Sequence, residues 1–236
     1  MVLFLLLLSL MKDESELKIS KAFFVVPIAY VVAIWSLYWV EINFNFNFNK
    51  YGVFPRTFVG FRGVFLTHFI HSNTSHLFNN SIPLFVLLSS LFYFYKEVAF
   101  KVLLLGGFLT GFLTWGFARD SYHIGASGIV YLLFSFVFFS GIIKKHYRLV
   151  ALSLIIIFLY GSMIWYVLPI KEGVSWEGHL SGFLVGFIFA IVYRNKGIVQ
   201  EAHQFTKTAF DALFDEKGNF SPPKIVENEH DEELEI

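Results

Sequence analysis

Apolar residues run along this chain in six long stretches, which polar or charged segments separate. The stretches cover residues 22–40, 77–95, 98–118, 124–143, 149–168 and 177–193. A helix of roughly 20 apolar residues crosses the hydrocarbon core of a bilayer, and the shortest stretch covers most of that distance at about 1.5 Å per residue. The alternation typical of a strand is confined to residues 43–48, a run that we expect at the membrane surface. The pattern therefore predicts an all-α membrane protein with six transmembrane helices.

The connection between the first two stretches is the longest, at roughly 35 residues, and loops of that length are usually functional or have structure of their own. We therefore expect a structured first loop. The predicted parts are an N-terminal cytoplasmic tail, a six-helix membrane domain and a soluble C-terminal tail, at residues 1–21, 22–194 and 195–236. The C-terminal tail is predicted to begin with an amphipathic surface helix and to be disordered from Ser221 onward. Charged residues follow Met11 directly, so both Met1 and Met11 are candidate starts.

The composition fits a protein that is dissolved in lipid. Hydrophobic residues make up 56% of the chain and charged residues 15%, against about 25% charged residues in ordinary soluble domains. A soluble domain of this length cannot hide 31 Phe, 11 Tyr and 5 Trp in one core, whereas a lipid bilayer solvates such side chains. The net charge of zero argues against a nucleic-acid partner. The absence of cysteine excludes disulfides, thiolate metal sites and cysteine nucleophiles.

Lysine and arginine residues predict the orientation, because the cytoplasmic loops of membrane proteins carry an excess of them. If the six helices alternate in direction, ten basic residues fall on one side: Lys12, Lys18, Lys21, Lys96, Lys101, Lys144, Lys145, Arg148, Arg194 and Lys196. Five fall on the other side: Lys50, Arg56, Arg62, Arg119 and Lys171. We therefore expect a multi-pass protein of a bacterial plasma membrane, with both termini in the cytoplasm.

Polar residues occur near the outer ends of the second, fourth and sixth helices, which all enter the membrane from the outer face. A hydroxyl (Ser127) and an imidazole (His179) are thereby expected at one depth, and polar groups in a bilayer usually face a functional interior. Neutral imidazole can take the proton of a serine hydroxyl and make it a nucleophile. We expect no acidic residue in a helix near that depth. Tyr131, one turn after Ser127, is expected to orient the imidazole by stacking.

Two polar residues of the second helix complete the predicted site. His76 and Asn80 are four residues apart and so project from one face. Together with the backbone N–H of Ser127, they can donate hydrogen bonds to the oxyanion of a tetrahedral intermediate.

Glycines surround the predicted nucleophile and base. Gly125 and Gly128 flank the Ser127 segment and let a substrate backbone approach. Gly178, Gly182 and Gly186 recur at every fourth residue, a spacing that lets two membrane helices approach closely.

Each motif also has a simpler interpretation. A single G-x-S-G or a glycine stripe in a membrane helix usually serves packing, and a single histidine near a helix end usually makes an interfacial hydrogen bond. Four histidines are alternative metal ligands, but the H-x-x-H spacing at His68 and His71 lacks the glutamate of a metalloprotease helix; the other two are His76 and His123. A channel or transporter would need polar residues across the whole bilayer. The shared depth of polar residues on three helices favours a catalytic site.

Taken together, these motifs resemble the rhomboid family of intramembrane proteases. The family carries H-x-x-x-x-H-x-x-x-N before and in the second helix, G-x-S-G at the start of the fourth, and H-x-x-G-x-x-x-G in the sixth. Here the first motif spans residues 71–80, the second 125–128 and the third 179–186. Order and spacing agree over roughly residues 22–194. Two departures are Phe61-Arg62, where the family often has Trp-Arg, and Gly178, where it often has alanine.

The resemblance implies a six-helix rhomboid bundle without metal or cofactor. It implies a serine endopeptidase that cleaves single-span transmembrane substrates near the outer leaflet through an acyl-enzyme. The residues that it assigns are Ser127 as nucleophile, His179 as base, His76, Asn80 and the Ser127 N–H as oxyanion donors, Tyr131 as the stacking ring, and His71 as support for the loop. The alternative is a non-catalytic rhomboid-like protein that binds transmembrane helices. The resemblance names neither the substrate nor the oligomeric state.

Overall fold

The described part of the chain is helical throughout. The computed structural model describes residues 21–159, 165–170, 172–198, 208 and 210–221. The longer helices are α2 (Ala22–Asn43), α5 (Thr74–Phe94), α6 (Ala99–Phe117), α7 (Ser127–Ile143), α8 (Tyr147–Leu159) and α9 (Trp176–Val192). The shorter elements are η1 (Asn49–Tyr51), α3 (Phe58–Phe61), α4 (Gly63–Leu66), η2 (Thr67–Phe69), η3 (Trp165–Val167) and η4 (Asp211–Leu213). The described residues contain no strand, only two isolated β-bridges, so the predicted all-α class is confirmed.

Within the described residues, three helices are long and apolar enough to cross a membrane: α2, α5 and α6. The helices α7, α8 and α9 are also apolar but shorter. The sequence predicted one apolar span as far as residue 168, whereas α8 ends at Leu159 in the described residues and η3 forms a separate turn. Residues 160–164 lie outside the described residues, as do the predicted N-terminal tail and the chain after Ser221.

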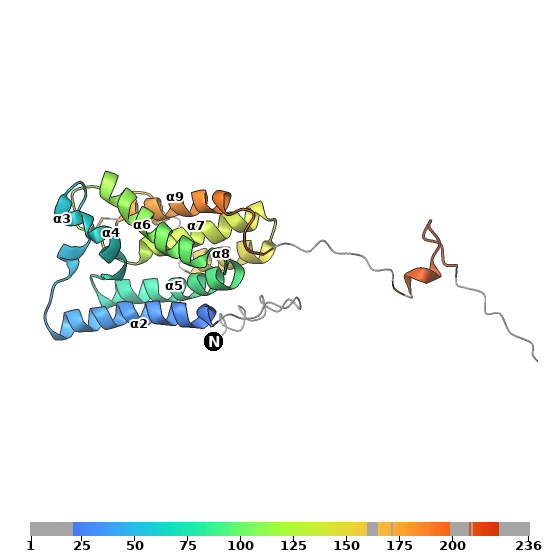
Figure 1. Ribbon diagram of the computed structural model, residues 1–236, viewed down its shortest axis with the longest axis horizontal. Helices are drawn as coiled ribbons and strands as arrows, with labels where there is room; N and C mark the ends of the chain where they lie inside the picture. The colour runs from blue at the N-terminus through green and yellow to red at the C-terminus, as the bar shows by residue number, and fades with distance from the viewer. Residues whose placement is uncertain (1–20, 160–164, 171, 199–207, 209, 222–236) are drawn as a thin grey trace, which may run out of the picture. The chain divides into compact units, whose positions relative to one another are not determined.

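The helix α7 lies at the centre of the bundle, where it packs against α5, α6, α8 and α9. The helix α2 runs alongside α5 at the edge of the bundle (Figure 1). The indole N–H of Trp35 on α2 donates a hydrogen bond of 2.9 Å to the hydroxyl of Ser81 on α5. Most of the apolar surface of α2 is exposed, as expected for a helix that faces lipid.

The predicted first loop is structured and packs against α6 and the connection that follows it. Val53 and His123 form a β-bridge, with backbone hydrogen bonds of 3.0 and 2.8 Å. The indole N–H of Trp115 donates to the carbonyl of Thr57 at 2.9 Å. Gly111 of α6 is needed here, because a Cβ at this position would lie 2.4 Å from the carbonyl oxygen of Val64. The loop thereby fixes the position of η2, which precedes the histidine motif.

The pair Phe61-Arg62, a departure from the family pattern, is well accommodated in this loop. The ring of Phe61 packs edge-on against Trp115, with centroids 5.4 Å apart. The guanidinium of Arg62 lies 4.5 Å from the centroid of the Tyr51 ring and donates to the carbonyl of Lys50 at 3.0 Å. Nearby, the exposed rings of Phe44 and Phe46 stack on one another, and no strand forms in the run 43–48.

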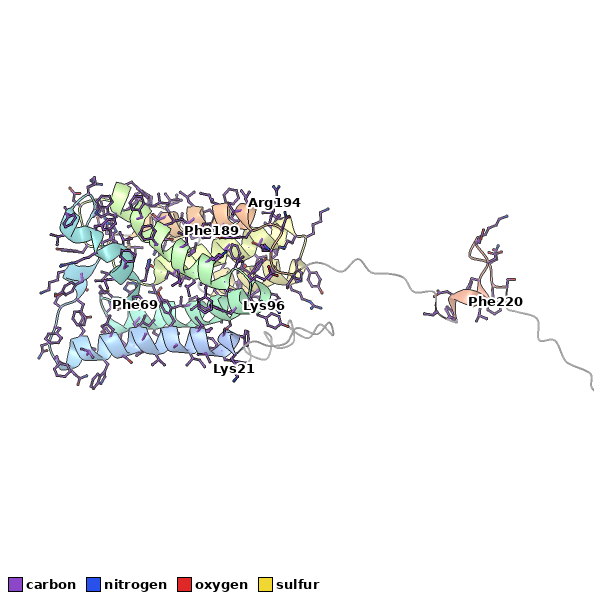
Figure 2. All side chains as sticks on the ribbon, viewed as in Figure 1. Lys21, Phe69, Lys96, Phe189, Arg194 and Phe220 are labelled. Carbon is purple, nitrogen blue, oxygen red and sulfur yellow. The ribbon has the colours of Figure 1, made fainter. Side chains whose placement is uncertain are left out.

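Basic residues mark the opposite end of the bundle. Figure 2 shows Lys21, Lys96 and Arg194 together at the end away from α3 and α4. At this end Lys196 forms an ion pair of 3.4 Å with Glu97, and the ammonium of Lys144 donates to the carbonyl of Ile198 at 3.2 Å.

The chain divides into two compact units, Met1–Gln200 and Glu201–Ile236, and the bundle belongs to the first. The described part of the second unit is a short turn. Phe214 and Phe220 form a bridge, and the carboxylate of Asp215 accepts hydrogen bonds from the N–H groups of Lys217 and Asn219. The segment 199–207, where a surface helix was predicted, lies outside the described residues.

Candidate active site

The hydroxyl of Ser127 and the imidazole of His179 are hydrogen-bonded. Ser127 begins α7 and His179 lies in the first turn of α9, and the distance from Oγ to Nε2 is 2.9 Å. The other ring nitrogen, Nδ1, lies 2.8 Å from the carbonyl oxygen of Tyr166 in η3. A carbonyl can only accept, so Nδ1 carries the proton and Nε2 presents its lone pair to Ser127. The pair therefore has the tautomer that a general base requires.

Tyr131 holds the plane of the imidazole. Its ring stacks on that of His179 with centroids 4.3 Å apart and planes 17° apart. Tyr131 lies one turn after Ser127 on α7, so a single helix positions both the predicted nucleophile and the ring that stacks on His179. Both Tyr131 and His179 are buried, which limits the imidazole to this orientation.

A strained turn places Ser127 at the start of its helix. Gly125 has a φ of +117°, which a side chain tolerates poorly, and a Cβ there would lie 2.7 Å from the ring of His76. The N–H of Gly125 donates to the carbonyl of Thr67 at 2.9 Å. The next N–H, of Ala126, donates to Nε2 of His71 at 3.4 Å. The predicted support of this loop by His71 thus has a geometric basis.

The buried histidines of the first loop are neutral near physiological pH. Burial, aided by the nearby His76, lowers the pKa of His71 to about 3. A neutral ring can accept from the N–H of Ala126, whereas a protonated ring has no free lone pair. Burial also lowers the pKa of His68 to about 4, and its Nε2 lies 3.0 Å from the carbonyl oxygen of Gly107. His68 therefore ties η2 to α6 and takes no part in the hydrogen-bonded pair of Ser127 and His179, which we call the dyad.

Asn80 on α5 has a buried amide donor without a partner among the described residues. Its side chain is 6% exposed, and the atom concerned is Nδ2. An unsatisfied buried amide costs about 1–3 kcal/mol and calls for an explanation. His76 lies one turn earlier on α5, and its Nδ1 is 3.3 Å from the hydroxyl of Ser72. The ring of His76 lies close to the turn before Ser127, because a Cβ built on Gly125 would be 2.7 Å from it and 3.6 Å from the Ser127 hydroxyl.

The glycines set the distance between α7 and α9. A Cβ on Gly182 would lie 2.1 Å from the carbonyl oxygen of Gly128, and one on Gly186 would lie 2.2 Å from that of Leu132. Neither contact leaves room for any side chain, so the two backbones touch. The hydroxyl of Ser135 donates to the carbonyl of Phe183 at 2.7 Å and fixes the same contact.

A buried acidic residue does lie in the first turn of α9, but it does not act as a third member of the Ser127–His179 pair. Glu177 is in the first turn of α9, two residues before His179, and is only 1% exposed. Its carboxylate contacts Arg119 and lies near His123, not the imidazole of His179, whose Nδ1 pairs with Tyr166. The available signal was a glutamate two residues before His179. The carbonyl of Tyr166 has no such signal, because any residue supplies one.

Comparison with known proteins places the chain in a family. A model of the rhomboid domain matches residues 60–196. The chain belongs to the rhomboid family. The matched range runs from α3 to just beyond α9 and includes the dyad, the histidine motif and the glycines.

Several relatives of this rhomboid protein come from mycobacteria. Uncharacterized proteins of Mycobacterium bovis and Mycobacterium tuberculosis are each 32% identical over 149 residues, which is 59% of this chain and 62% of the relative. An uncharacterized protein of Mycobacterium leprae is 31% identical over 140 residues, 54% of each chain. The chain thus spans about three-fifths or less of the length of these relatives.

Proposed function

We propose that this rhomboid protein is a serine endopeptidase that cleaves transmembrane segments of membrane proteins. One observation carries the proposal: Ser127 Oγ lies 2.9 Å from Nε2 of His179, while the carbonyl of Tyr166 engages Nδ1. In a serine protease triad, a carboxylate holds the histidine in the correct tautomer. Here a backbone carbonyl and the stacked ring of Tyr131 take that task.

Attack on the substrate begins with proton transfer from Ser127 to Nε2 of His179. The serine oxygen adds to the carbonyl carbon of the scissile amide, whose oxygen becomes an oxyanion. Donors from Asn80, His76 and the backbone N–H of Ser127 stabilise that charge, because preorganised donors need no reorganisation when the oxyanion forms. The unpaired Nδ2 of Asn80 needs no bond to be broken before it donates.

Collapse of the tetrahedral intermediate breaks the carbon–nitrogen bond. The imidazolium of His179 gives its proton to the leaving amine, and an ester of Ser127 remains. Water then attacks this acyl-enzyme with His179 again as base, which releases the carboxylic acid and restores both side chains. No metal or cofactor takes part in these steps.

The proposed setting is a bilayer crossed by six helices, with the site in its outer half. The shorter apolar helices α7, α8 and α9 are the remaining spans of this proposal. The end of the bundle with Lys21, Lys96 and Arg194 (Figure 2) is the cytoplasmic end in this proposal, and the excess of basic residues predicted for that side assigns both termini to the cytoplasm. The starts of α7 and α9 lie at the other end, so single-span substrates are cut near the outer leaflet.

The deciding experiment is cleavage of a model transmembrane substrate by the purified protein. Ser127→Ala and His179→Ala should each abolish cleavage without unfolding the protein, because either change removes the activated nucleophile. A fluorophosphonate should label Ser127 of the unaltered chain, with the adduct mapped by mass spectrometry. Substrate association without cleavage and without labelling would instead support a non-catalytic protein that binds transmembrane helices.

A further inference from the structure

Glu177 is a buried acidic side chain that the proposed mechanism does not use. Its Oε1 accepts a hydrogen bond from the backbone N–H of Arg119 and pairs with the Arg119 guanidinium, both at 3.3 Å. Its Oε2 has no hydrogen-bond partner among the described residues and lies 3.9 Å from Nδ1 of His123. A buried carboxylate is costly even when paired. Such a group at the start of the helix that carries the catalytic base requires a reason.

The partners of Glu177 belong to the connection that leads to Ser127. Arg119 and His123 lie between α6 and α7, whereas Val174 and Ser175 directly precede α9. The guanidinium of Arg119 also donates to the carbonyl of Val174 at 2.7 Å. The segment that precedes Ser127 and the segment that precedes His179 are therefore joined through side chains, in addition to the contact between α7 and α9.

His123 strengthens the same junction through the N-terminal cap of α9. Burial lowers its pKa, so the ring is neutral. Its Nε2 lies 3.0 Å from the carbonyl oxygen of Arg119 and carries the proton, which leaves Nδ1 to accept from the hydroxyl of Ser175 at 2.6 Å. The same hydroxyl accepts from the N–H of Gly178 at 3.3 Å, the residue just before His179.

We propose that Glu177 is a positioning residue of the active site. Together with Arg119 and His123, it fixes the first turn of α9 against the segment that precedes Ser127. The glycine contacts bring α7 and α9 near one another, but glycines carry no side chains that interlock. The directional bonds of Glu177 fix the rotation and height of the first turn, and thereby the 2.9 Å bond of the dyad. The proposal rests on the proposed protease function.

Two substitutions of Glu177 and one matched control test the proposal. Glu177→Ala removes every contact of the carboxylate, while Glu177→Gln keeps an acceptor for the N–H of Arg119 and removes the charge. Asp120→Asn is the control. Asp120 lies in the same connection and forms an ion pair with Arg56, but both side chains are exposed and neither contacts α9 through this pair.

The full chain is purified in detergent, and three quantities are measured for each variant. These are kcat and KM for a model transmembrane substrate, the rate of fluorophosphonate labelling at Ser127, and the unfolding temperature. Misplacement of a catalytic group by about 1 Å can cost roughly 100-fold in rate. We expect Glu177→Ala to lower kcat by about 100-fold, to slow labelling by a similar factor, and to leave KM within about threefold. Glu177→Gln should lose about tenfold, and Asp120→Asn should stay within about twofold.

The outcomes separate positioning from stability. Unchanged kcat and labelling per folded molecule, with only a lower unfolding temperature, would show a purely structural role and overturn the proposal. A rise in KM alone would overturn it too. If Glu177→Ala does not fold, Glu177→Gln decides by the same criteria. If the unaltered chain is neither labelled nor active, the protease function fails and the positioning role with it, whereas a labelled wild type with equally fast Glu177 variants rejects only the positioning role.

Discussion

The helices α8 and α9 both pack against α7, but they are held in different ways. Along α9, backbone touches backbone at Gly182 and Gly186, and the hydroxyl of Ser135 bonds across the contact. Along α8, Leu149, Leu152 and Ile156 are buried, but large apolar side chains are exposed beyond them. The firm contact carries the dyad, which needs a fixed distance. In the proposed function a membrane substrate approaches past α8, so the fixed dyad and the access route would belong to different helices.

The largest expected effect comes from breaking the firm contact. Gly182→Ala places a methyl group 2.1 Å from the carbonyl oxygen of Gly128, so α9 must move away from α7. We expect a loss of at least about 100-fold in kcat, because a shift of about 1 Å misplaces His179. Overpacking should also lower the free energy of unfolding by about 1–3 kcal/mol. Cleavage kinetics and thermal unfolding measure the two effects.

Gly116→Ala provides the matched control for this substitution. Gly116 lies in α6, and a Cβ there meets no atom within 4 Å. This variant should match the unaltered protein in both measurements. Full activity of Gly182→Ala would show that the distance between α7 and α9 does not control the dyad.

The second substitution tests Asn80 as a predicted oxyanion donor. Asn80→Ala should lower kcat by about 10- to 100-fold, less than the loss of a sole oxyanion donor, because His76 and the N–H of Ser127 remain. The substrate KM should change little, since the interaction forms only in the transition state. Fluorophosphonate should still label Ser127, though more slowly. Asn79→Ala is the control, because Asn79 is the exposed neighbour. A change confined to KM would make Asn80 a substrate-binding residue instead.

The sequence predicts the parts of this site that depend on spacing along one helix. The interval from Ser127 to Tyr131 places both side chains against His179, and the interval from Gly182 to Gly186 places both glycines against α7. His76 and Asn80 lie four residues apart on α5, and their joint role stays a prediction. Hydrophobic stretches also located the six helices to within a few residues, apart from the end of α8. Spacing and hydropathy describe one segment at a time, so they predict best the features that lie within one segment.

The pairing of Ser127 with His179 followed from their shared depth, but two other features that depend on separate segments meeting were not predicted. The carbonyl of Tyr166 reaches His179 from the short turn η3, and a backbone group has no sequence signature. Glu177 was overlooked because a carboxylate is expensive inside a membrane protein, and its cost is offset by Arg119 from a distant connection. In both cases a group from another part of the chain completes the environment of the base or of its helix.

The last substitution tests whether α8 limits the access of a membrane substrate, and its expected effect on the rate of cleavage is small. Phe158 is 85% exposed on this helix, beyond its last buried residue, Ile156. If substrates approach between α8 and α5, a smaller side chain should ease their access. We expect Phe158→Ala to raise the rate of cleavage of a transmembrane substrate by about two- to fivefold, because access rather than chemistry limits many enzymes with a moving element. Labelling of Ser127 by a small fluorophosphonate should not change. Phe100→Ala, on the exposed face of α6, is the control for loss of a lipid-facing ring.

A crosslink between α8 and α5 should have the opposite effect and block the membrane substrate while labelling continues. Unchanged cleavage in the crosslinked protein would place the access route elsewhere, and the loose packing of α8 would then have no role in admitting substrate.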